Sequence, residues 1–292
     1  KNGFLALTWP KEYGGAGLTA IESLVIAEEF ALSGVPGGGP NDGFGIGMLG
    51  NTILAVGTEE QKKHFLPRVL SGEDRWCQGY SEPSAGSDLG NLGCRAVLDG
   101  DEWVINGQKI WTSAGHLANH IFVLARTSPD DVKHRGITFL LVDMRQKGVE
   151  VRPIKMMSGD SEFNEVFFTD ARCPKENVVG EINGGWMVAM TLLGNERGAG
   201  AVVSGISFRG ELDKLNSLAR EKGVTTNPHI RQRLAQAHIK VEIMRFLGYR
   251  TLTAFMNGSQ PGPEASIGKL WWSEYHKEVT ELAVDILGAD AL

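Results

Sequence analysis

Apolar residues recur at helical spacing in two stretches near the start of the chain. The first stretch follows Thr19, a residue type that caps helices well. The second begins at Thr58, which forms a capping box with Gln61, and it ends at residues 71–72. Between them, residues 33–50 contain eight glycines and two prolines, a composition that predicts a loop.

The pattern changes to β-type after these helices. Runs rich in β-branched and aromatic residues predict strands at residues 121–125, 137–142 and 165–168. Residues 102–111 have the same character, and Asn106-Gly107 within them predicts a tight hairpin turn.

Helical spacing returns from Gly185 onwards. It predicts one long helix over residues 186–219 and two more over residues 229–255 and 267–287, with Pro261-Gly262-Pro263 as the break between the last two. The order helical, β, helical predicts an α+β fold. We expect an N-terminal helical domain at 1–75, a middle β domain at 76–183 and a C-terminal helical bundle at 184–292.

Composition narrows the function classes. With 42% hydrophobic and 22% charged residues in 292, the chain can bury a substantial core. A net charge of −6 and the lack of a basic cluster argue against nucleic-acid binding. No apolar run approaches the ~20 residues of a membrane helix. The three cysteines form no CxxC pair, which favours a reducing compartment. The chain begins and ends abruptly, so we expect a piece of a longer, C-terminally extended subunit.

Glycine is over-represented, with 38 residues or about 13% against a usual ~7%. Such a content indicates either many turns or backbone lying close to a flat or phosphorylated ligand. Residues 45–50 match the dinucleotide fingerprint GxGxxG, but the glycine-rich segment before them cannot be a buried strand. We therefore do not expect a nucleotide-binding fold here.

The segment CQGYSEPSAGSDL at residues 77–89 is the most specific in the chain. Hydroxyls at Ser81, Ser84 and Ser87 lie among small residues, and Gly86 permits close backbone approach. These groups suit either a polar turn or the binding of a ring edge or phosphate. The residues alone favour the polar turn.

This segment resembles the signature Thr/Ser-Glu-Pro-x-Ala-Gly-Ser-Asp of acyl-CoA dehydrogenases. The resemblance covers nearly the whole chain, through WPKEYGG at 9–15, GTEEQK at 57–62, NGQKIWTS at 106–113, FNEVFF at 163–168 and VGEINGGW at 179–186. It implies N-terminal helices, a β-barrel-like middle domain and a C-terminal helical bundle, with non-covalent FAD and an acyl-CoA thioester as substrate.

Residue roles follow from the same resemblance. Flavin contacts are implied for Gln78, Tyr80, Ser81, Gly86, Ser87, Trp111, Thr112 and Ser113. Ser87 also falls where the family touches CoA. From its residue type alone, Trp111 would instead be a core aromatic.

The implied reaction is α,β-dehydrogenation, which needs a base for the α-proton and hydrogen bonds to the thioester carbonyl. In one branch of the family the base precedes an arginine on the long helix after the β domain, and Glu196 occupies that position, next to Arg197. Gly194, Asn195 and Arg197 would then contact the substrate. Leu192 and Leu193, one turn earlier, would desolvate Glu196 and raise its pKa. The alternatives are a solvated surface glutamate, or a base in the later Tyr-Glu-Gly phrase that this chain does not include.

Two departures from the family pattern bear on assembly. The Arg-x-x-Phe-Gly stretch that holds a neighbouring subunit's FAD becomes residues 220–228, where Arg220 matches loosely and the phenylalanine is missing. Likewise, Gln-x-x-Gly-Gly becomes residues 285–289. These changes suit a branch in which two homologous chains pair, often on bulky or sterol-type acyl-CoA substrates.

The family usually forms homodimers or homotetramers, so a homo-oligomer and a heterotetramer both remain open. Electron-transfer flavoprotein is the implied acceptor, within fatty-acid β-oxidation in a bacterial cytoplasm or an organelle matrix. An acyl-CoA oxidase and a non-catalytic subunit of a heteromeric dehydrogenase are the alternatives. His116 and His120 have a spacing that could ligate a metal on a helix, but no third ligand lies near them and Ala114-Gly115 indicates a turn, so we expect no metal.

Overall fold

The computed structural model describes residues 3–35, 39, 41–131, 133–197, 199–257 and 266–291; within its helices, the side chains of residues 31, 195–197, 199–204 and 255 are not described. The chain forms two compact units. One comprises residues 1–17 and 37–195, and the other residues 18–36 and 196–292.

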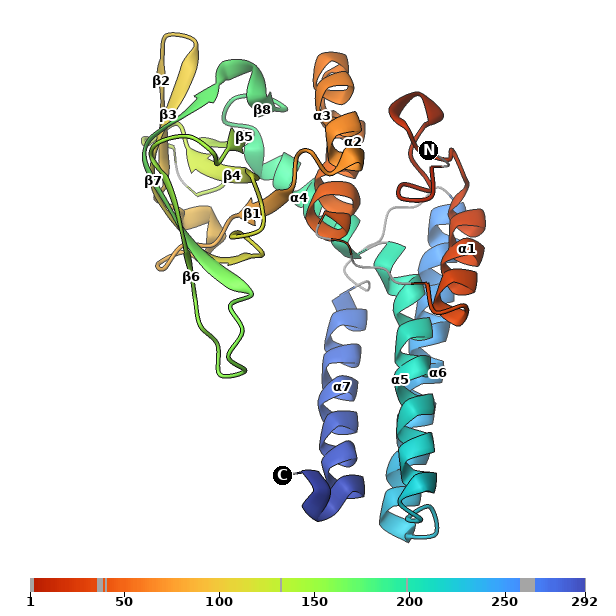
Figure 1. Ribbon diagram of the computed structural model, residues 1–292. Coiled ribbons are helices and arrows are strands. Elements are labelled where there is room, and N and C mark those ends of the chain that lie inside the picture. Colours follow the sequence, from red (N-terminus) through yellow and green to blue (C-terminus); the bar gives the residue numbers. More distant parts are fainter. Residues whose placement is uncertain are drawn as a thin grey trace. The chain divides into compact units, whose positions relative to one another are not determined.

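Short helices open the first unit. They are η1 (Lys11–Tyr13), η2 (Asp42–Gly50), α2 (Asn51–Val56) and α3 (Glu59–Ser71). The predicted capping box of α3 is confirmed, because the Gln61 amide donates to Thr58 Oγ1 and the Thr58 amide donates to Gln61 Oε1. The Gln61 side chain also donates to the carbonyls of Glu176 and Val178, which fixes the start of α3 beside the β domain (Figure 1).

The predicted loop at residues 33–50 is wrong for its second half, which forms the π-helix η2. Two of its glycines are required by packing. A Cβ on Gly45 would lie 2.2 Å from Asn41 Oδ1, and one on Gly50 would lie 2.0 Å from Trp9 Cζ2. The GxGxxG match at residues 45–50 lies inside the helical segment η2 and not in a strand-to-helix turn.

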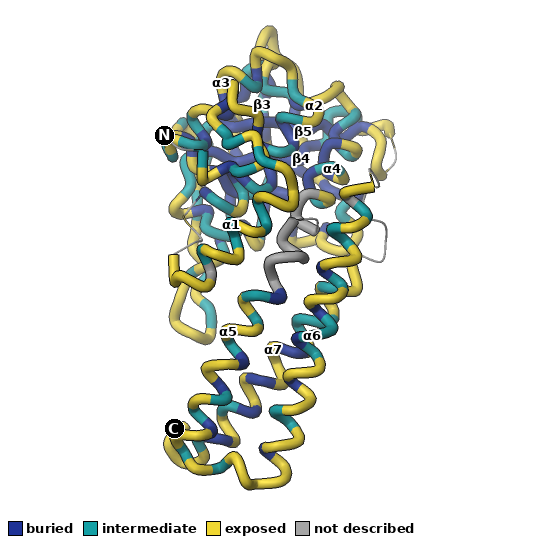
Figure 2. Tube along the Cα trace, turned by 90° about the vertical axis from the view of Figure 1, so that its right-hand side faces the viewer, coloured by how far each residue is buried: buried dark blue, intermediate teal, exposed yellow. Residues whose placement is uncertain are grey.

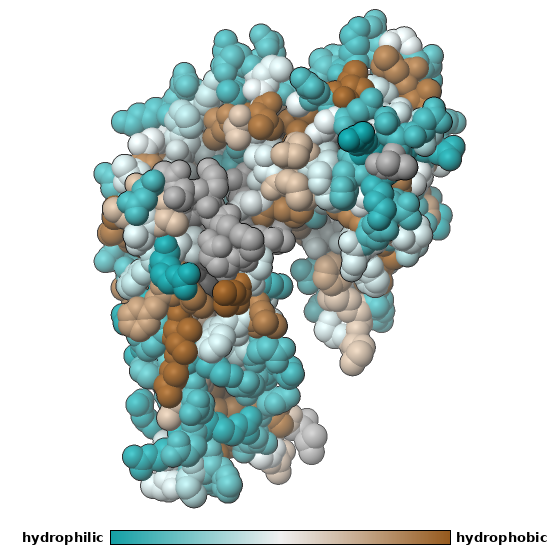
Figure 3. Space-filling model, turned by 180° about the vertical axis from the view of Figure 1, so that it is seen from behind, coloured by the Kyte–Doolittle hydropathy of each residue, from teal (hydrophilic) through white to brown (hydrophobic). Residues whose placement is uncertain are grey.

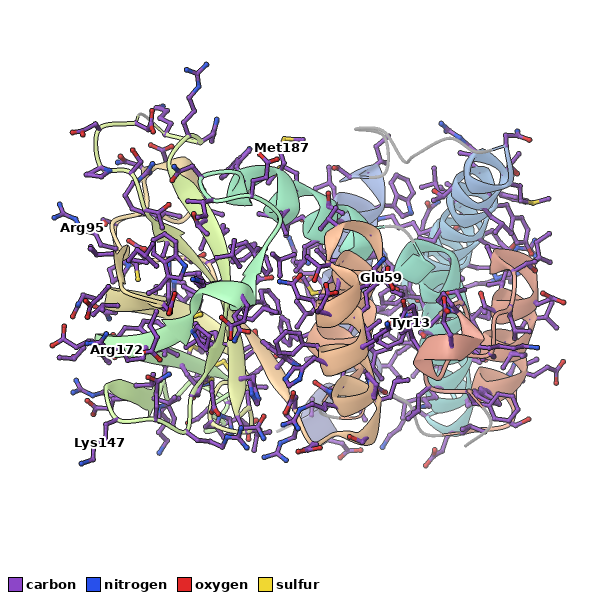
Figure 4. The ribbon with its side chains drawn as sticks, turned by 90° about the horizontal axis from the view of Figure 1, so that it is seen from above. Tyr13, Glu59, Arg95, Lys147, Arg172 and Met187 are labelled. Atoms are coloured by element: carbon purple, nitrogen blue, oxygen red, sulfur yellow. The ribbon has the colours of Figure 1, made fainter. Side chains whose placement is uncertain are left out.

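The middle of the first unit is an eight-stranded sheet with the order β6-β7-β3-β2-β4-β5-β8, in which β1 pairs with β4. The strands are β1 (Trp76–Gly79), β2 (Arg95–Asp99), β3 (Glu102–Ser113), β4 (His120–Arg126), β5 (Ile137–Asp143), β6 (Val149–Pro153), β7 (Phe163–Pro174) and β8 (Val178–Val179), with the short turns η3 (Leu89–Asn91) and η4 (Lys175–Asn177) between strands. The basic side chains of Arg95 and Lys147 are exposed, and that of Arg172 is paired with Asp99 at the end of β2 (Figure 4).

The predicted hairpin turn at Asn106-Gly107 is wrong, because β3 runs through it without a break. These residues form a bulge instead: the pairing with β7 shifts there, and the Asn106 amide group is bonded to Asp170. Gly107 has a φ of 149°, and a Cβ on it would lie 2.7 Å from Cys94 Cα. The tight turn that joins β2 to β3 is at Gly100, with a φ of 65°.

The two faces of β4 and β5 are both buried, which explains their continuous hydrophobic sequences. Phe122 and Leu124 belong to one core cluster, whereas Ile121 and Val123 belong to another. The first cluster also contains Val188, Ala189 and Leu192 of α4 (Gly185–Arg197), a helix whose Met187 points outward (Figure 4).

The second unit consists of α1 (Ala20–Leu32), α5 (Ala199–Glu221), α6 (Pro228–Met256), α7 (Ser266–Leu287) and η6 (Gly288–Ala291). The predicted helices at 229–255 and 267–287 are confirmed as α6 and α7. The predicted single helix at 186–219 appears as α4 and α5, on either side of residue 198, which is not described. Buried positions follow the facing sides of α5, α6 and α7 (Figure 2), and Tyr275 at their centre donates its hydroxyl to the Phe208 carbonyl. No described helix is long and apolar enough to cross a membrane.

Candidate active site

A single backbone contact joins the two sequence phrases predicted to meet the flavin. The Ile110 amide of β3 donates to the Ser81 carbonyl over 2.9 Å. The segment after β1, which carries Tyr80 and Ser81, therefore lies beside the segment of β3 that carries Trp111 and Thr112. Residues about thirty positions apart in the sequence thus lie side by side.

Beneath that contact lies a buried ion pair that the sequence analysis missed. Lys109 Nζ lies 2.7 Å from Glu82 Oε1 and also donates to the Tyr80 carbonyl over 3.0 Å. The Lys109 side chain is fully buried and that of Glu82 is 6% exposed. The carboxylate further accepts the amides of Gly93 and Cys94. No signal for this pair is visible in the sequence, because Glu82 and Lys109 lie 27 residues apart in separate phrases.

The segment following Glu82 forms a small turn, because the amides of Glu82 and Ala85 each donate to the other residue's carbonyl. Gly86 and Ser87, both assigned to the cofactor by resemblance, are exposed beyond this turn. Nothing lies within 4 Å of a Cβ placed on Gly86, so the protein's own packing does not require glycine there. Gly79, in contrast, is required by packing, since a Cβ there would lie 2.8 Å from Ile121 Cδ1.

Trp111 is not a core residue. The pairing of β3 with β7 shifts between Lys109 and Thr112, and Trp111 sits in this bulge with a φ of 59°. Its side chain is 58% exposed and makes an edge contact with Phe163 at 6.0 Å between ring centroids. A non-glycine residue held at positive φ stores strain, which is a feature of functional sites.

Two buried polar atoms in this region have no hydrogen-bond partner in the described part of the chain. They are Gln78 Oε1 on β1 and Thr112 Oγ1 on β3. An unsatisfied buried polar atom costs about 1–3 kcal/mol, so a bound polar ligand would relieve that cost. Unpartnered polar atoms and the exposed Trp111 indole are the kinds of group that the polar edge and flat face of a flavin ring would contact. Ser113 is half-buried at the end of the same strand.

The residues assigned to the substrate are only partly described. Gly194 is exposed on α4, two residues after the buried Leu192. Asn195, Glu196 and Arg197 lie in the last turn of α4, but their side chains are outside the described part of the structure. Their roles, including Glu196 as base, therefore stay predictions.

The helical unit contains a separate polar cavity of about 460 Å³ at the α5–α6 connection. Arg220, the loose match to the family's flavin-binding arginine, lines it together with Arg231 and Thr225. Both arginines are exposed, and no acidic partner for them is found among the described residues.

Neither predicted histidine position suits a metal. His116 lies in a turn and contacts Asn164 Oδ1, whereas His120 lies on β4 and contacts Asn119 Oδ1. Helical i, i+4 spacing therefore does not apply to them. Within the described ranges no group of three metal-binding side chains converges.

Comparison with known proteins identifies the family. Residues 1–73, 77–171 and 183–292 match the N-terminal, middle and C-terminal domains of acyl-CoA dehydrogenases. The acyl-CoA dehydrogenase IpdE1 of Mycobacterium tuberculosis is 44% identical over 289 residues, which cover 98% of this chain and 73% of that protein.

Two solved structures share the fold. The steroid acyl-CoA dehydrogenase Tcur3481-Tcur3483 superposes with a TM-score of 0.88 at 38% identity, over 98% of this chain and 73% of the other. A chain of the ChsE4-ChsE5 complex from Mycobacterium tuberculosis gives 0.83 at 37% identity, over 98% and 74%. This chain therefore belongs to the acyl-CoA dehydrogenases, a family of flavoprotein oxidoreductases of lipid degradation that are typically tetrameric.

Proposed function

We propose that the protein binds FAD and converts an acyl-CoA thioester to its trans-2-enoyl-CoA, passing the electrons to an electron-transfer flavoprotein. The observation that carries the proposal is the Ser81–Ile110 contact, which joins the two flavin-binding phrases into one surface. Anaerobic titration of the purified protein with acyl-CoA tests it, since turnover bleaches the flavin absorption. An unbleached flavin across a full acyl-CoA panel contradicts the proposal.

On this proposal, Gln78, Tyr80, Ser81, Thr112 and Ser113 hold the flavin ring, with Trp111 against its face. Gly86 and Ser87 close the loop over the cofactor, and Ser87 extends to CoA. The chemistry supplied by bound FAD is acceptance of the hydride that leaves the substrate β-carbon. The protein's own part is to hold both reactants in line and to exclude water.

Glu196 is the base in this scheme and removes the substrate α-proton, while Gly194, Asn195 and Arg197 contact the thioester. The buried Leu192 on the preceding turn supports an apolar setting for this end of α4. Glu196→Gln keeps the size of the side chain and removes its basicity, so we expect FAD to stay bound while bleaching slows by at least about 100-fold. Near-normal bleaching in that variant would place the base elsewhere.

We further infer that the acyl group is bulky and steroid-like, and that the working assembly pairs this chain with a homologous one. Support comes from the two-chain steroid dehydrogenase and the ChsE4-ChsE5 complex among its structural neighbours. The altered residues 220–228 and 285–289 agree with unequal sharing of the cofactor.

Figure 3 shows hydrophobic side chains exposed on the helices of the second unit, and such an assembly would cover some of them. Along α6 the exposed large hydrophobic side chains include Ile239, Phe246, Tyr249 and Met256, spaced seven, three and seven residues apart. Rows with this spacing favour helix-to-helix association. Bleaching across acyl-CoA substrates of varied length and ring content tests the substrate class, and co-purification with candidate homologous chains tests the pairing.

The heteromeric neighbours also favour one second candidate, a subunit that contributes little cofactor binding by itself. The visible absorption spectrum of the chain purified alone separates the two. A yellow protein supports the catalytic subunit, whereas a colourless protein that becomes yellow only with a partner supports the second candidate.

A further inference from the structure

We propose that the buried Lys109–Glu82 pair is a positioning device that holds Ser81 and the Trp111 bulge in the geometry required to bind FAD. This inference rests on the proposed function for its ligand, but its structural part concerns this chain alone. Neither residue is assigned to the cofactor, and both side chains are buried.

The Ser81 peptide is held through its neighbours on both sides. The residues on either side of it bind one ammonium group, since Lys109 Nζ contacts the Tyr80 carbonyl at 3.0 Å and Glu82 Oε1 at 2.7 Å. The next residue on β3, Ile110, donates its amide to Ser81 itself. Three consecutive residues are therefore attached to two consecutive residues of β3, which leaves the Ser81 peptide little rotational freedom.

The ion pair also borders the bulge that carries Trp111. Lys109 pairs in register with Val166, and the register is lost from there until Thr112 pairs with Asn164. Lys109 is thus the last regularly paired residue before the bulge that exposes Trp111. The ion pair anchors one side of the bulge, and the other side is anchored by Asn164, whose side-chain amide donates to the Thr112 carbonyl.

The buried pair is a poor source of stability. Burying an ammonium and a carboxylate together is costly, and a well-packed uncharged pair is often at least as stable. Glu82 reduces this cost by accepting the Gly93 and Cys94 amides, so that the charges link three separate backbone segments. If the pair serves mainly to fix the local geometry, removing both charges should weaken FAD binding even where the protein still folds.

The experiment compares Lys109→Met, Glu82→Gln and the double variant with wild type. It measures thermal unfolding, FAD affinity by fluorescence titration of the FAD-stripped chain, and hydrogen exchange of residues 80–88 and 107–113 without FAD. We expect the double variant to unfold closer to wild type than Lys109→Met, because no unpaired charge remains buried. Its FAD affinity should still fall at least tenfold, about 1.4 kcal/mol, and its Ile110 amide should exchange at least about tenfold faster.

A second ion pair supplies the matched control. Arg68 binds Asp74 through two contacts of 2.8 Å, and Asp74 is buried. Arg68→Met with Asp74→Asn should lower stability without changing exchange at Ile110 or FAD affinity. Wild-type FAD affinity and Ile110 protection in the Lys109/Glu82 double variant would overturn the positioning role, as would an equal loss of FAD affinity in the control.

The outcomes also separate the two proposals. A wild-type chain that binds no FAD contradicts the proposed function, while hydrogen exchange still reports whether the pair orders this segment. Should the double variant not fold, wild-type exchange decides: an Ile110 amide that exchanges as fast as an exposed loop contradicts the positioning role.

Discussion

Asn164 on β7 donates its side-chain amide to the Thr112 carbonyl on β3 over 2.9 Å, directly beside the bulge that exposes Trp111. Asn164 is fully buried, and its Oδ1 contacts His116 Nδ1 at 3.2 Å. One side chain therefore joins β7, the end of β3 and the turn that follows it.

Replacing Asn164 with leucine should lower the free energy of unfolding by about 1–3 kcal/mol, because the buried Thr112 carbonyl loses its shorter hydrogen bond and keeps only the one from the Gly115 amide at 3.4 Å. Urea unfolding measures this change. Asn106→Leu is the control, since Asn106 makes its bonds to Asp170 at an exposed bulge of the same strand pair. Equal losses in the two variants would show that burial at Asn164 contributes nothing.

Trp111 should matter for flavin chemistry and little for stability. Because its side chain is 58% exposed, Trp111→Ala should change the free energy of unfolding by no more than about 0.5 kcal/mol. Flavin bleaching by acyl-CoA should slow at least about tenfold if the indole contacts the ring. In the control, Trp103→Ala, loss of a side chain that is 4% exposed should cost about 3–5 kcal/mol.

The glycines of η2 offer a matched pair. Gly50→Ala should destabilise the protein by about 1–3 kcal/mol, because the new methyl would overlap Trp9, whose indole is already fixed by a 2.8 Å bond to Asn51. Gly43→Ala, with nothing within 4 Å of the new methyl, should be neutral or slightly stabilising. Urea midpoints for the two variants measure the difference, and a stable Gly50→Ala would contradict the packing at Trp9.

Because His120 is buried, we expect the folded protein to lose stability on mild acidification. Burial lowers the pKa of His120 from its ordinary value of 6.5, and the nearby Asp74 and Asp143 offset this only in part. Below pH 6.5 the unfolded chain takes up a proton that the folded chain resists, so stability falls as the pH falls through that range. His120→Gln should flatten the dependence of the urea midpoint between about pH 7 and 5. A variant with the same slope as wild type would contradict this source of acid sensitivity.

Local chemistry made part of the fold predictable. The capping box of α3 depends on residues three positions apart, and the helical spacing of α6 and α7 is visible within each segment. Asn106-Gly107 has the composition of a turn but forms a bulge, because Asn106 is hydrogen-bonded to Asp170, which is 64 residues away in the sequence. The π-helix η2 was missed for a related reason, since its glycines are selected by contact with Trp9 and Asn41.

The candidate site, too, could be predicted from the sequence only in part. Resemblance to a family suggested which residues to examine, but the exposure of Trp111 depends on a bulge opposite β7. The Lys109–Glu82 pair could not be predicted from the sequence. Its members are 27 residues apart, and within its own phrase each resembles an ordinary surface charge. Glu196 was singled out by its place in a phrase, and its side chain lies outside the described residues.

The double-sided burial of β4 has a consequence for how the sheet finds its alignment. A slip of one residue would exchange the contents of the two core clusters, and both sets are apolar, so hydrophobicity alone does not penalise the error strongly. Asn119, just before β4, resolves this ambiguity. It accepts the Arg75 amide and donates to the Glu73 carbonyl, each over 2.8 Å, while its own carbonyl accepts the Met144 amide. The hydrogen bonds of Asn119 thus favour one alignment of β1, β4 and β5 relative to one another.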